Sequence, residues 1–320
     1  MLPRALDSAL DQTVPARILI ADDGDCDRTV GILRDRYGEH LRGGRIIHLR
    51  TGAVEPWENW RAGAEACETE LVSWLQDDDI VCKQYVERII YAFAKSEQLG
   101  ARPHVWMACL DCADPSAQFG LHFAFNGPIF PMKTLYGVCE PCHWLEGSPL
   151  AASSYFTSHS LSPALAYRNG PKFRDALRTM PERMDVFIER LMPAEMALHG
   201  GVITDPAVVG YWRQHGSNLS RDQHPDQPRQ TKLLVAHLDD LLDRIGDWQE
   251  PFLAWLRIVT PGLILGWLGQ LDTTEKEGGK SRHGHAVRHL MLESLEGRVR
   301  VVSGSRRWWQ RLWPFRGSAA

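Results

Sequence analysis

The sequence Leu71-Val72-Ser73-Trp74-Leu75-Gln76-Asp77-Asp78-Asp79-Ile80 contains a short apolar run that ends in three consecutive carboxylates. Its length and composition predict a buried strand, and the spacing of apolar residues from Tyr85 to Phe93 predicts a helix after it. The carboxylates would then lie at the carboxyl end of a strand, where open α/β sheets bind ligands. Because adjacent carboxylates repel one another, a hard divalent cation shared with substrate phosphates would stabilise them. The alternative is a solvated acidic turn in which Asp79 caps the next helix.

The overall composition is that of an ordinary globular protein. The chain has 320 residues, of which 44% are hydrophobic and 24% are charged, so it can form one large domain or two smaller ones. The net charge of -4 gives no reason to expect nucleic acid as a partner. The sequence does not open with a secretory signal, and its 7 cysteines are an odd number. We therefore expect reduced thiols and a cytoplasmic location.

Predicted strands and helices alternate along the first third of the chain. Strands are predicted at 17–21, 45–49, 71–75 and 104–110, and helices at 2–10, at 57–67, from 85 towards 99, and around Val30, Leu33 and Tyr37. This alternation implies parallel βαβ units. The strand at 17–21 also ends in an acidic run, Asp22-Asp23-Gly24-Asp25. Because crossover connections would put both strand ends on one sheet edge, we expect this run to lie near Asp77 and Asp78.

Five segments follow one another in an order that is more specific than any one of them. They are Asp7-Ser8-Ala9-Leu10-Asp11-Gln12-Thr13, the run from Ile18 to Asp27, Asn59 followed by Ala62-Gly63, Gln76-Asp77-Asp78-Asp79, and the run from Tyr211 to Ser220. In this order the segments resemble the motifs of family 2 glycosyltransferases of the GT-A fold, including a DXD-type motif. The resemblance covers roughly the first two thirds of the chain.

The resemblance implies an α/β fold of the GT-A type, with a mainly parallel sheet flanked by helices and a helical C-terminal extension. The expected parts are a nucleotide-sugar-binding half (1–110), an acceptor-binding half (111–225) and the extension (226–320). The implied activity is inverting sugar transfer from a nucleotide-sugar donor. The acceptor would be a hydroxyl group of a glycan, a lipid-linked molecule or another compound.

The resemblance also implies which residues bind the donor: Asp22, Asp23, Asn59, Asp77 and Arg213. Asp22 or Asp23 would hold the base, and Asp77 would hold the ribose. Asp78 and His215 would contact a Mg²⁺ or Mn²⁺ ion that bridges the diphosphate. For His215, a partly buried loop histidine without a ligand is the alternative interpretation.

Asp185 is the expected catalytic base. It lies at the start of a helix predicted at 184–198, and the family often places its base just before an apolar helical run in this half. The alternative is that Asp185 stabilises the helix end, because a carboxylate in the first turn interacts favourably with the helix dipole. Glu182 is the second candidate for the base.

The sequence departs from the family pattern in three places. The family normally begins with a strand that ends in a P-x-Y-N type turn, whereas Met1 here falls just before the first predicted helix. Gln76 and Cys26 stand where the family usually has an aspartate and a serine. The missing strand favours a truncated or degenerate nucleotide-sugar-binding protein without catalysis, whereas the retained acidic residues favour an enzyme.

Two C-x-x-C pairs leave a further alternative open. Cys109 with Cys112 and Cys139 with Cys142 could form a tetrahedral zinc site. The gap between the pairs is longer than in the usual zinc ribbon, and Cys109 falls in a predicted strand. Buried thiols without a metal are the alternative.

The C-terminal region contains two apolar segments of different character. The segment 251–271 is strongly apolar but contains Arg257, which predicts a packed or interfacial helix and not a membrane span. The segment 305–316 alternates four arginines with three tryptophans, Leu312 and Phe315. Such a segment could attach peripherally to the cytoplasmic face of an anionic membrane. The alternative is an aromatic tail that packs on the protein's own surface.

Overall fold

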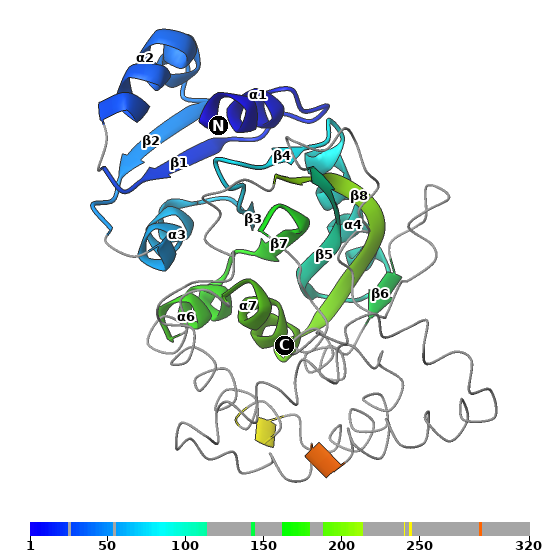
Figure 1. Cartoon of the computed structure of the whole chain (residues 1–320). Helices are drawn as coiled ribbons and strands as arrows, with labels where there is room; N and C mark the ends of the chain where they lie inside the picture. The colour runs from blue at the N-terminus through cyan, green and yellow to red at the C-terminus, as the bar shows by residue number, and fades with distance from the viewer. Residues whose placement is uncertain are drawn as a thin grey trace, which may run out of the picture.

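The computed structural model describes residues 1–24, 27–53, 56–113, 142–144, 162–179 and 188–213, and the short pieces 240, 243–244 and 288–289. Helices and strands alternate along most of this length (Figure 1). In chain order the elements are α1 (Leu2–Leu10), β1 (Ile18–Asp22), α2 (Asp27–Arg42), β2 (Ile46–Arg50), α3 (Pro56–Ala66), β3 (Leu71–Ser73), β4 (Ile80–Val81), α4 (Tyr85–Gln98), β5 (Pro103–Ala113), β6 (Cys142–Trp144), η1 (Ser162–Ala164), β7 (Leu165–Arg168), α6 (Pro171–Thr179), α7 (Ile188–Ala197) and β8 (Gly201–Arg213).

The described strands form two sheets. β1 and β2 pair in parallel, with Ile18 opposite Ile46. The second sheet has the order β3-β7-β5-β8-β4, and β6 also pairs with β8. Among the strand pairs described for this sheet, β5 and β8 are parallel and the others are antiparallel. The prediction of a mainly parallel sheet is therefore wrong, because β7 lies antiparallel between β3 and β5.

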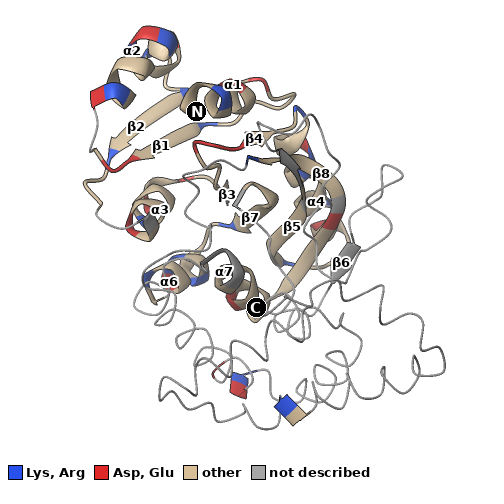
Figure 2. Ribbon diagram, in the orientation of Figure 1, with Lys and Arg blue, Asp and Glu red and all other residues tan. Residues whose placement is uncertain are grey.

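The two acidic runs follow strands that belong to different sheets. In the described part of the chain, β1 pairs only with β2, and β3 pairs only with β7. We expected Asp22 and Asp23 to lie near Asp77 and Asp78 because β1 and β3 would share one sheet edge. This premise is wrong, since the two strands belong to different sheets. Figure 2 shows acidic residues at the end of β1 and in the segment that leads into β4. The four apolar residues 18–21 of β1 all remain partly exposed.

The smaller sheet has a core of its own. Leu6 of α1 and Leu33 and Tyr37 of α2 pack with Ile46 of β2 in one buried cluster. α3 lies on the opposite side of this sheet (Figure 1). There a Cβ added to Gly63 would come within 3.2 Å of the Ala21 Cβ. The glycine therefore allows α3 to pack closely on β1.

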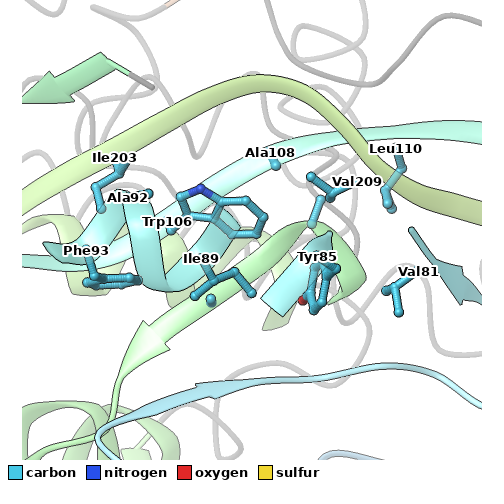
Figure 3. Packing of buried hydrophobic residues seen from close by; sticks show 12 residues of the cluster. Val81, Tyr85, Ile89, Ala92, Phe93, Trp106, Ala108, Leu110, Ile203 and Val209 are labelled. Carbon is cyan, nitrogen blue, oxygen red and sulfur yellow. The ribbon is translucent and has the colours of Figure 1, made fainter. Parts of the chain in front are cut away.

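The larger sheet packs against α4. Trp106 of β5 is completely buried, and its ring contacts Tyr85 edge-on at 5.9 Å between centroids. Ile89 and Phe93 continue the buried face of α4 at helical spacing (Figure 3). The helix predicted from Tyr85 is thereby confirmed, although Ile90, one of its predicted apolar positions, is 45% exposed.

The segment between β3 and α4 differs from the prediction. The acidic turn leads into the two-residue strand β4, which pairs with β8, and not directly into a helix. α4 begins at Tyr85 with Gln84 at its N-cap. The interpretation of Asp79 as the helix cap is therefore wrong. β4 was not predicted, because two residues show no periodicity of their own.

An ion pair joins α4 to β8. Asp205 is completely buried, and its carboxylate accepts two hydrogen bonds from the Arg88 guanidinium, each of 2.6 Å. It also accepts the Trp106 indole N–H at 3.2 Å and the Ala207 backbone N–H at 3.0 Å. A buried carboxylate with this many donors is well compensated for the loss of water.

The second half of the described chain contains α6 and α7. The helix predicted at 184–198 is observed as α7, which begins at Ile188 and contains Pro193. Residues 184–187 and the strand predicted at 119–125 lie outside the described residues. No helix in the described ranges is long and apolar enough to span a bilayer.

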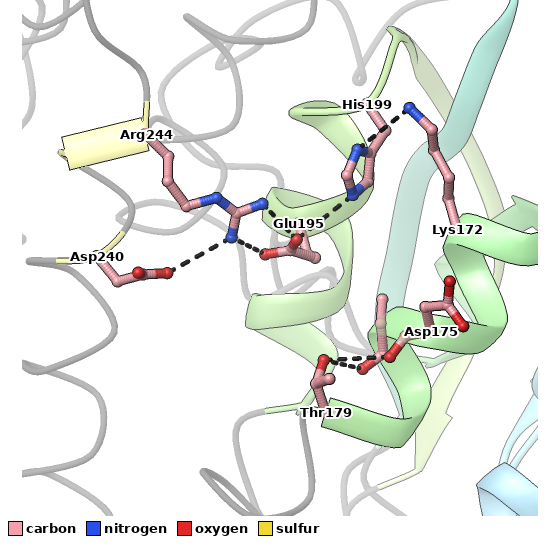
Figure 4. A network of polar contacts seen from close by, with 8 residues as sticks. Lys172, Asp175, Thr179, Glu195, His199, Asp240 and Arg244 are labelled. Atoms are coloured by element: carbon pink, nitrogen blue, oxygen red, sulfur yellow. Dashed lines mark hydrogen bonds and ion pairs between the residues drawn. The ribbon is translucent and has the colours of Figure 1, made fainter.

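A polar network connects α6, α7 and the short piece around Arg244 (Figure 4). Glu195 accepts hydrogen bonds of 2.6 and 2.7 Å from the Arg244 guanidinium. His199 lies 3.5 Å from Glu195 through Nε2 and 3.5 Å from the Lys172 ammonium through Nδ1. Burial lowers the pKa of His199 and of His104 below the ordinary histidine value, and the charge of Lys172 lowers both further.

We expect the folded state to lose stability as the pH falls below about 6.5, the ordinary histidine pKa. Because the two histidine pKa values are lower in the folded chain, the unfolded chain binds more protons in the window just below 6.5. Stability therefore rises with pH through this window and is fully present above it. Urea unfolding midpoints between pH 5 and 7.5 would measure the effect. His104→Gln should flatten the dependence, and an unchanged pH profile in that variant would contradict the assignment to His104.

Candidate active site

The segment Gln76-Asp77-Asp78-Asp79 is a turn between β3 and β4. The Asp79 backbone N–H donates to the Gln76 carbonyl at 3.2 Å. The three carboxylates differ in exposure: Asp77 is exposed, Asp78 is partly buried and Asp79 is completely buried. The Asp79 Oδ1 atom accepts the Arg213 backbone N–H at 3.0 Å. The turn therefore presents two accessible carboxylates and is anchored by the third.

The end of β8 holds this turn. The Arg213 guanidinium donates through Nε to the Asp78 carbonyl and through Nη2 to the Asp77 carbonyl, the latter at 3.4 Å. In the register of β4 and β8, Ile80 faces Tyr211 and Val81 faces Gly210. The Tyr211-Trp212-Arg213 motif, in which Arg213 was expected to bind the donor, thus lies directly against the acidic turn.

Gly210→Ala is expected to destabilise the fold by about 1–3 kcal/mol, the usual cost of overpacking. A Cβ at Gly210 would lie 2.5 Å from the backbone oxygen of Ile80 and 3.3 Å from the Val81 Cα. These backbone atoms cannot move away without weakening the pairing of β4 with β8. Urea unfolding would measure the loss. Gly31→Ala is the matched control, because a Cβ there meets nothing within 4 Å, and equal stability of the two variants would contradict the prediction.

The other side of β4 is held by α1. The Ser8 hydroxyl oxygen accepts the Val81 backbone N–H at 3.3 Å. The Gln12 side chain donates to the Cys82 carbonyl at 2.9 Å and accepts the Val86 backbone N–H at 3.1 Å. The Ser8 and Gln12 motif positions therefore fix the segment that follows the acidic turn. The sequence motif includes Ser8 and Gln12, but it did not predict that they bond to this segment.

Asp22 lies in a separate polar group at the end of β1. Its Oδ1 atom accepts the Gly24 backbone N–H at 3.1 Å, and its Oδ2 atom lies 2.8 Å from His48 Nε2. Asp22 is buried, whereas the neighbouring Asp23 is exposed. His48 was not among the predicted site residues. The parallel register could have indicated it, because His48 faces Ile20 and Asp22 lies two residues further on the same face.

Asn59 of α3 joins the same group. Its side-chain N–H donates to the Ala21 carbonyl at 2.9 Å, and its Oδ1 atom accepts the Thr51 hydroxyl at 2.6 Å. Thr51 lies 3.1 Å from the Asp22 carbonyl through the same hydroxyl. The structure therefore brings Asn59 next to Asp22 and gives its amide group a role in closing the ends of β1 and β2.

An aromatic cluster lies next to the acidic turn. Trp74, three residues before Asp77, stacks on Trp60 of α3 with ring centroids 5.6 Å apart. Its other neighbours are Tyr167 at 5.3 Å and Phe173 at 5.7 Å. The cluster connects the start of the turn to α3, β7 and α6. The cluster was not predicted, because its residues come from distant parts of the chain.

The chemistry of the turn fits a hard divalent cation. Accessible carboxylate oxygens, such as those of Asp77 and Asp78, are the ligands that Mg²⁺ prefers. Such an ion usually completes its coordination with water and substrate phosphates. Within the described ranges, no three or more His, Cys, Asp or Glu side chains are grouped so as to hold an ion.

Several predicted site residues lie outside the described residues: Asp185, Glu182, His215 and the basic-aromatic segment 305–316. Cys109, Cys112 and Cys142 lie in the strands β5 and β6, whereas Cys139 is outside the description. The roles of all these residues, including the zinc site, stay predictions.

Residues 1–108 match the sequence model of the family described as glycosyl transferase family 2. The N-terminal third of the chain is therefore a family 2 glycosyltransferase domain, which confirms the family that the motif order indicated. No curated protein matches the chain significantly in sequence.

Solved structures with a similar fold include those of S. aureus TarS. The match to one TarS structure has a TM-score of 0.51 at 16% identity and covers 96% of this chain and 53% of that chain. For TarS 1-349 the TM-score is 0.49 at 16% identity, with 92% and 84% covered. For TarS 1-349 with UDP-GlcNAc it is 0.47 at 15% identity, with 92% and 85% covered. The likeness concerns the fold alone, which is α/β and GT-A-like.

Proposed function

We propose that the protein transfers a sugar from a nucleotide-sugar donor to an acceptor hydroxyl, with inversion at the anomeric carbon and with a divalent cation. The observation that carries the proposal is the acidic turn after β3. It presents Asp77 and Asp78 to solvent and is held by Arg213, within a chain whose first 108 residues match family 2. The nucleotide-sugar donor and the inverting course follow from the resemblance to that family.

Each residue of the proposed donor site has a role that agrees with its surroundings. Asp22 already bonds to Gly24 and His48, so we assign contact with the base to the exposed Asp23 and positioning of its loop to Asp22. Asp77, which is exposed, would bind the ribose. Asn59 supports the segment that carries Asp22 and Asp23 through its bond to the Ala21 carbonyl.

Asp78 would hold Mg²⁺ or Mn²⁺, with His215 as a second ligand. When bound, the cation would neutralise the charge that develops on the leaving diphosphate. Asp185 would accept the proton of the acceptor hydroxyl as a general base. A glycan or a lipid-linked acceptor, and peripheral membrane attachment through residues 305–316 at the cytoplasmic face, belong to the same proposal.

The test combines binding and turnover by the full chain. Calorimetry with UDP, UDP-GlcNAc, GDP-mannose and dTDP-glucose, each with Mn²⁺ and with EDTA, should detect a donor whose binding the cation strengthens. Uridine nucleotides come first because TarS has been crystallised with UDP and UDP-GlcNAc. Donor turnover should then depend on Mn²⁺ or Mg²⁺, and NMR of the product should give the anomeric configuration. Absence of binding by every nucleotide sugar would overturn the proposal.

A nucleotide-sugar-binding protein without catalysis is the second candidate. The separation of β1 from β3 into two sheets favours it, because the two acidic runs then have no shared sheet edge. The same experiment distinguishes the candidates. Cation-dependent binding without donor hydrolysis or transfer would support the second one.

A further inference from the structure

We infer that Arg213 is a positioning residue for the acidic turn, and that it acts through the backbone of Asp77 and Asp78 without touching the donor. The inference rests on the proposed function, because it concerns the cation and donor affinity of that turn. It changes the role that the family resemblance implied for Arg213, which was direct contact with the nucleotide sugar.

The contacts of Arg213 fall on three successive residues of the turn. Its guanidinium donates to the carbonyls of Asp77 and Asp78, and its backbone N–H donates to the Asp79 carboxylate. The residue is only 9% exposed. A single buried side chain thus fixes the backbone at both residues whose carboxylates are accessible.

The charge of Arg213 contributes as well as its geometry. Three neighbouring carboxylates repel one another, and a cation placed against their backbone offsets part of that repulsion. The planar guanidinium can bridge two carbonyl oxygens at once, whereas an ammonium group is a single point charge on a flexible chain. Both the charge and the fork shape are therefore used.

The strand that carries Arg213 is itself firmly placed. β8 pairs with β5 over most of its length and with β4 next to the turn. Because of this pairing, a shift of the β8 end would move the turn and its two accessible carboxylates together.

The experiment compares Arg213→Lys and Arg213→Met with Arg88→Lys in the full chain. Arg88 is the matched control, because its guanidinium also makes two bonds of known geometry and is mostly buried, and these two bonds go to Asp205 of β8 and not to the turn. Hydrogen exchange of the segment 74–81 should become about tenfold or more faster in both Arg213 variants and stay unchanged in Arg88→Lys. This readout requires neither a cation nor a donor. Unchanged exchange in Arg213→Met would overturn the inference.

The second readout is affinity. For both Arg213 variants, Mn²⁺-dependent donor binding should weaken about 10–100-fold, as is usual for partners behind a metal ligand. Nucleotide binding in EDTA should stay at the wild-type value. If an Arg213 variant instead bound nucleotide more weakly in EDTA, and Mn²⁺ strengthened that binding as much as in the wild type, Arg213 would contact the donor directly. If Arg213→Lys bound the donor in Mn²⁺ as tightly as the wild type, the forked shape of the guanidinium would not be needed. If the wild type binds no nucleotide, the proposed function fails, and the exchange result still decides whether Arg213 holds the turn.

Discussion

Asp78→Ala is expected to reduce cation-dependent sugar transfer about a thousandfold, because a bound cation contributes several kcal/mol to stabilising the charge of a leaving group. The fold should remain intact. Asp78 is only partly buried, and the Arg213 guanidinium bonds to its backbone carbonyl, which alanine retains. Stability without the cation should hold or rise slightly, since one of three repelling carboxylates is removed. Steady-state rates against Mn²⁺ concentration, with urea unfolding in parallel, would measure both effects.

Asp79→Ala is the matched comparison. Asp79 is completely buried and accepts the Arg213 backbone N–H. Its loss should therefore appear as a decrease in stability of about 1–3 kcal/mol, the usual cost of leaving a buried group unsatisfied. A wild-type rate with a wild-type Mn²⁺ dependence in Asp78→Ala would remove Asp78 from the cation site.

Asp185→Asn is expected to reduce the transfer rate by roughly two to four orders of magnitude, the usual contribution of a general base. The residue precedes α7 by three positions, and α7 is firmly packed: Leu191, Met192 and Ala194 are completely buried. Asparagine preserves the shape and removes the proton acceptor. Donor affinity should change little, because Asp185 would face the acceptor. The pH dependence of the rate should lose its acidic limb.

The control for Asp185 is Glu182→Gln, which should leave the rate near the wild-type value. The reverse outcome, with a loss in Glu182→Gln alone, would make Glu182 the base. If Asp185 only interacts with the helix dipole, its neutralisation should cost about 0.3–1 kcal/mol of stability and leave the rate unchanged. Rates and unfolding curves together therefore separate the two interpretations.

Elements with a strong local pattern could be predicted from the sequence. The helix α4 and the strand β3 follow from periodicity and composition, and both are observed. β4 and the insertion of β7 beside β3 could not be predicted in this way. Each depends on pairing with a strand that is far away in the sequence, and local periodicity carries no information on such a partner.

In the candidate site, too, some features could be predicted from local sequence, whereas others depend on distant partners. Motif order selected Asp77, Asp78 and Arg213, and the structure brings Arg213 onto the turn. The bond from Asp22 to His48 was missed, although the strand register contains the signal for it. The bonds that Gln12 makes across 70 and 74 residues of sequence were also missed. A side-chain amide that bonds to distant backbone groups leaves no pattern in its own neighbourhood.

The hold of β8 on the acidic turn also has a consequence for biosynthesis. The bond from Arg213 to Asp79 spans 134 residues of sequence. While the N-terminal third leaves the ribosome, its acidic turn lacks the strand that orders it, and the edge of β5 that later receives β8 stays open. Because contacts between distant segments form late and slowly, the nascent chain passes through a stage in which it exposes unpaired strand edges. Such edges are prone to aggregation, so the yield of soluble protein should be sensitive to translation speed and to chaperones that bind extended chains.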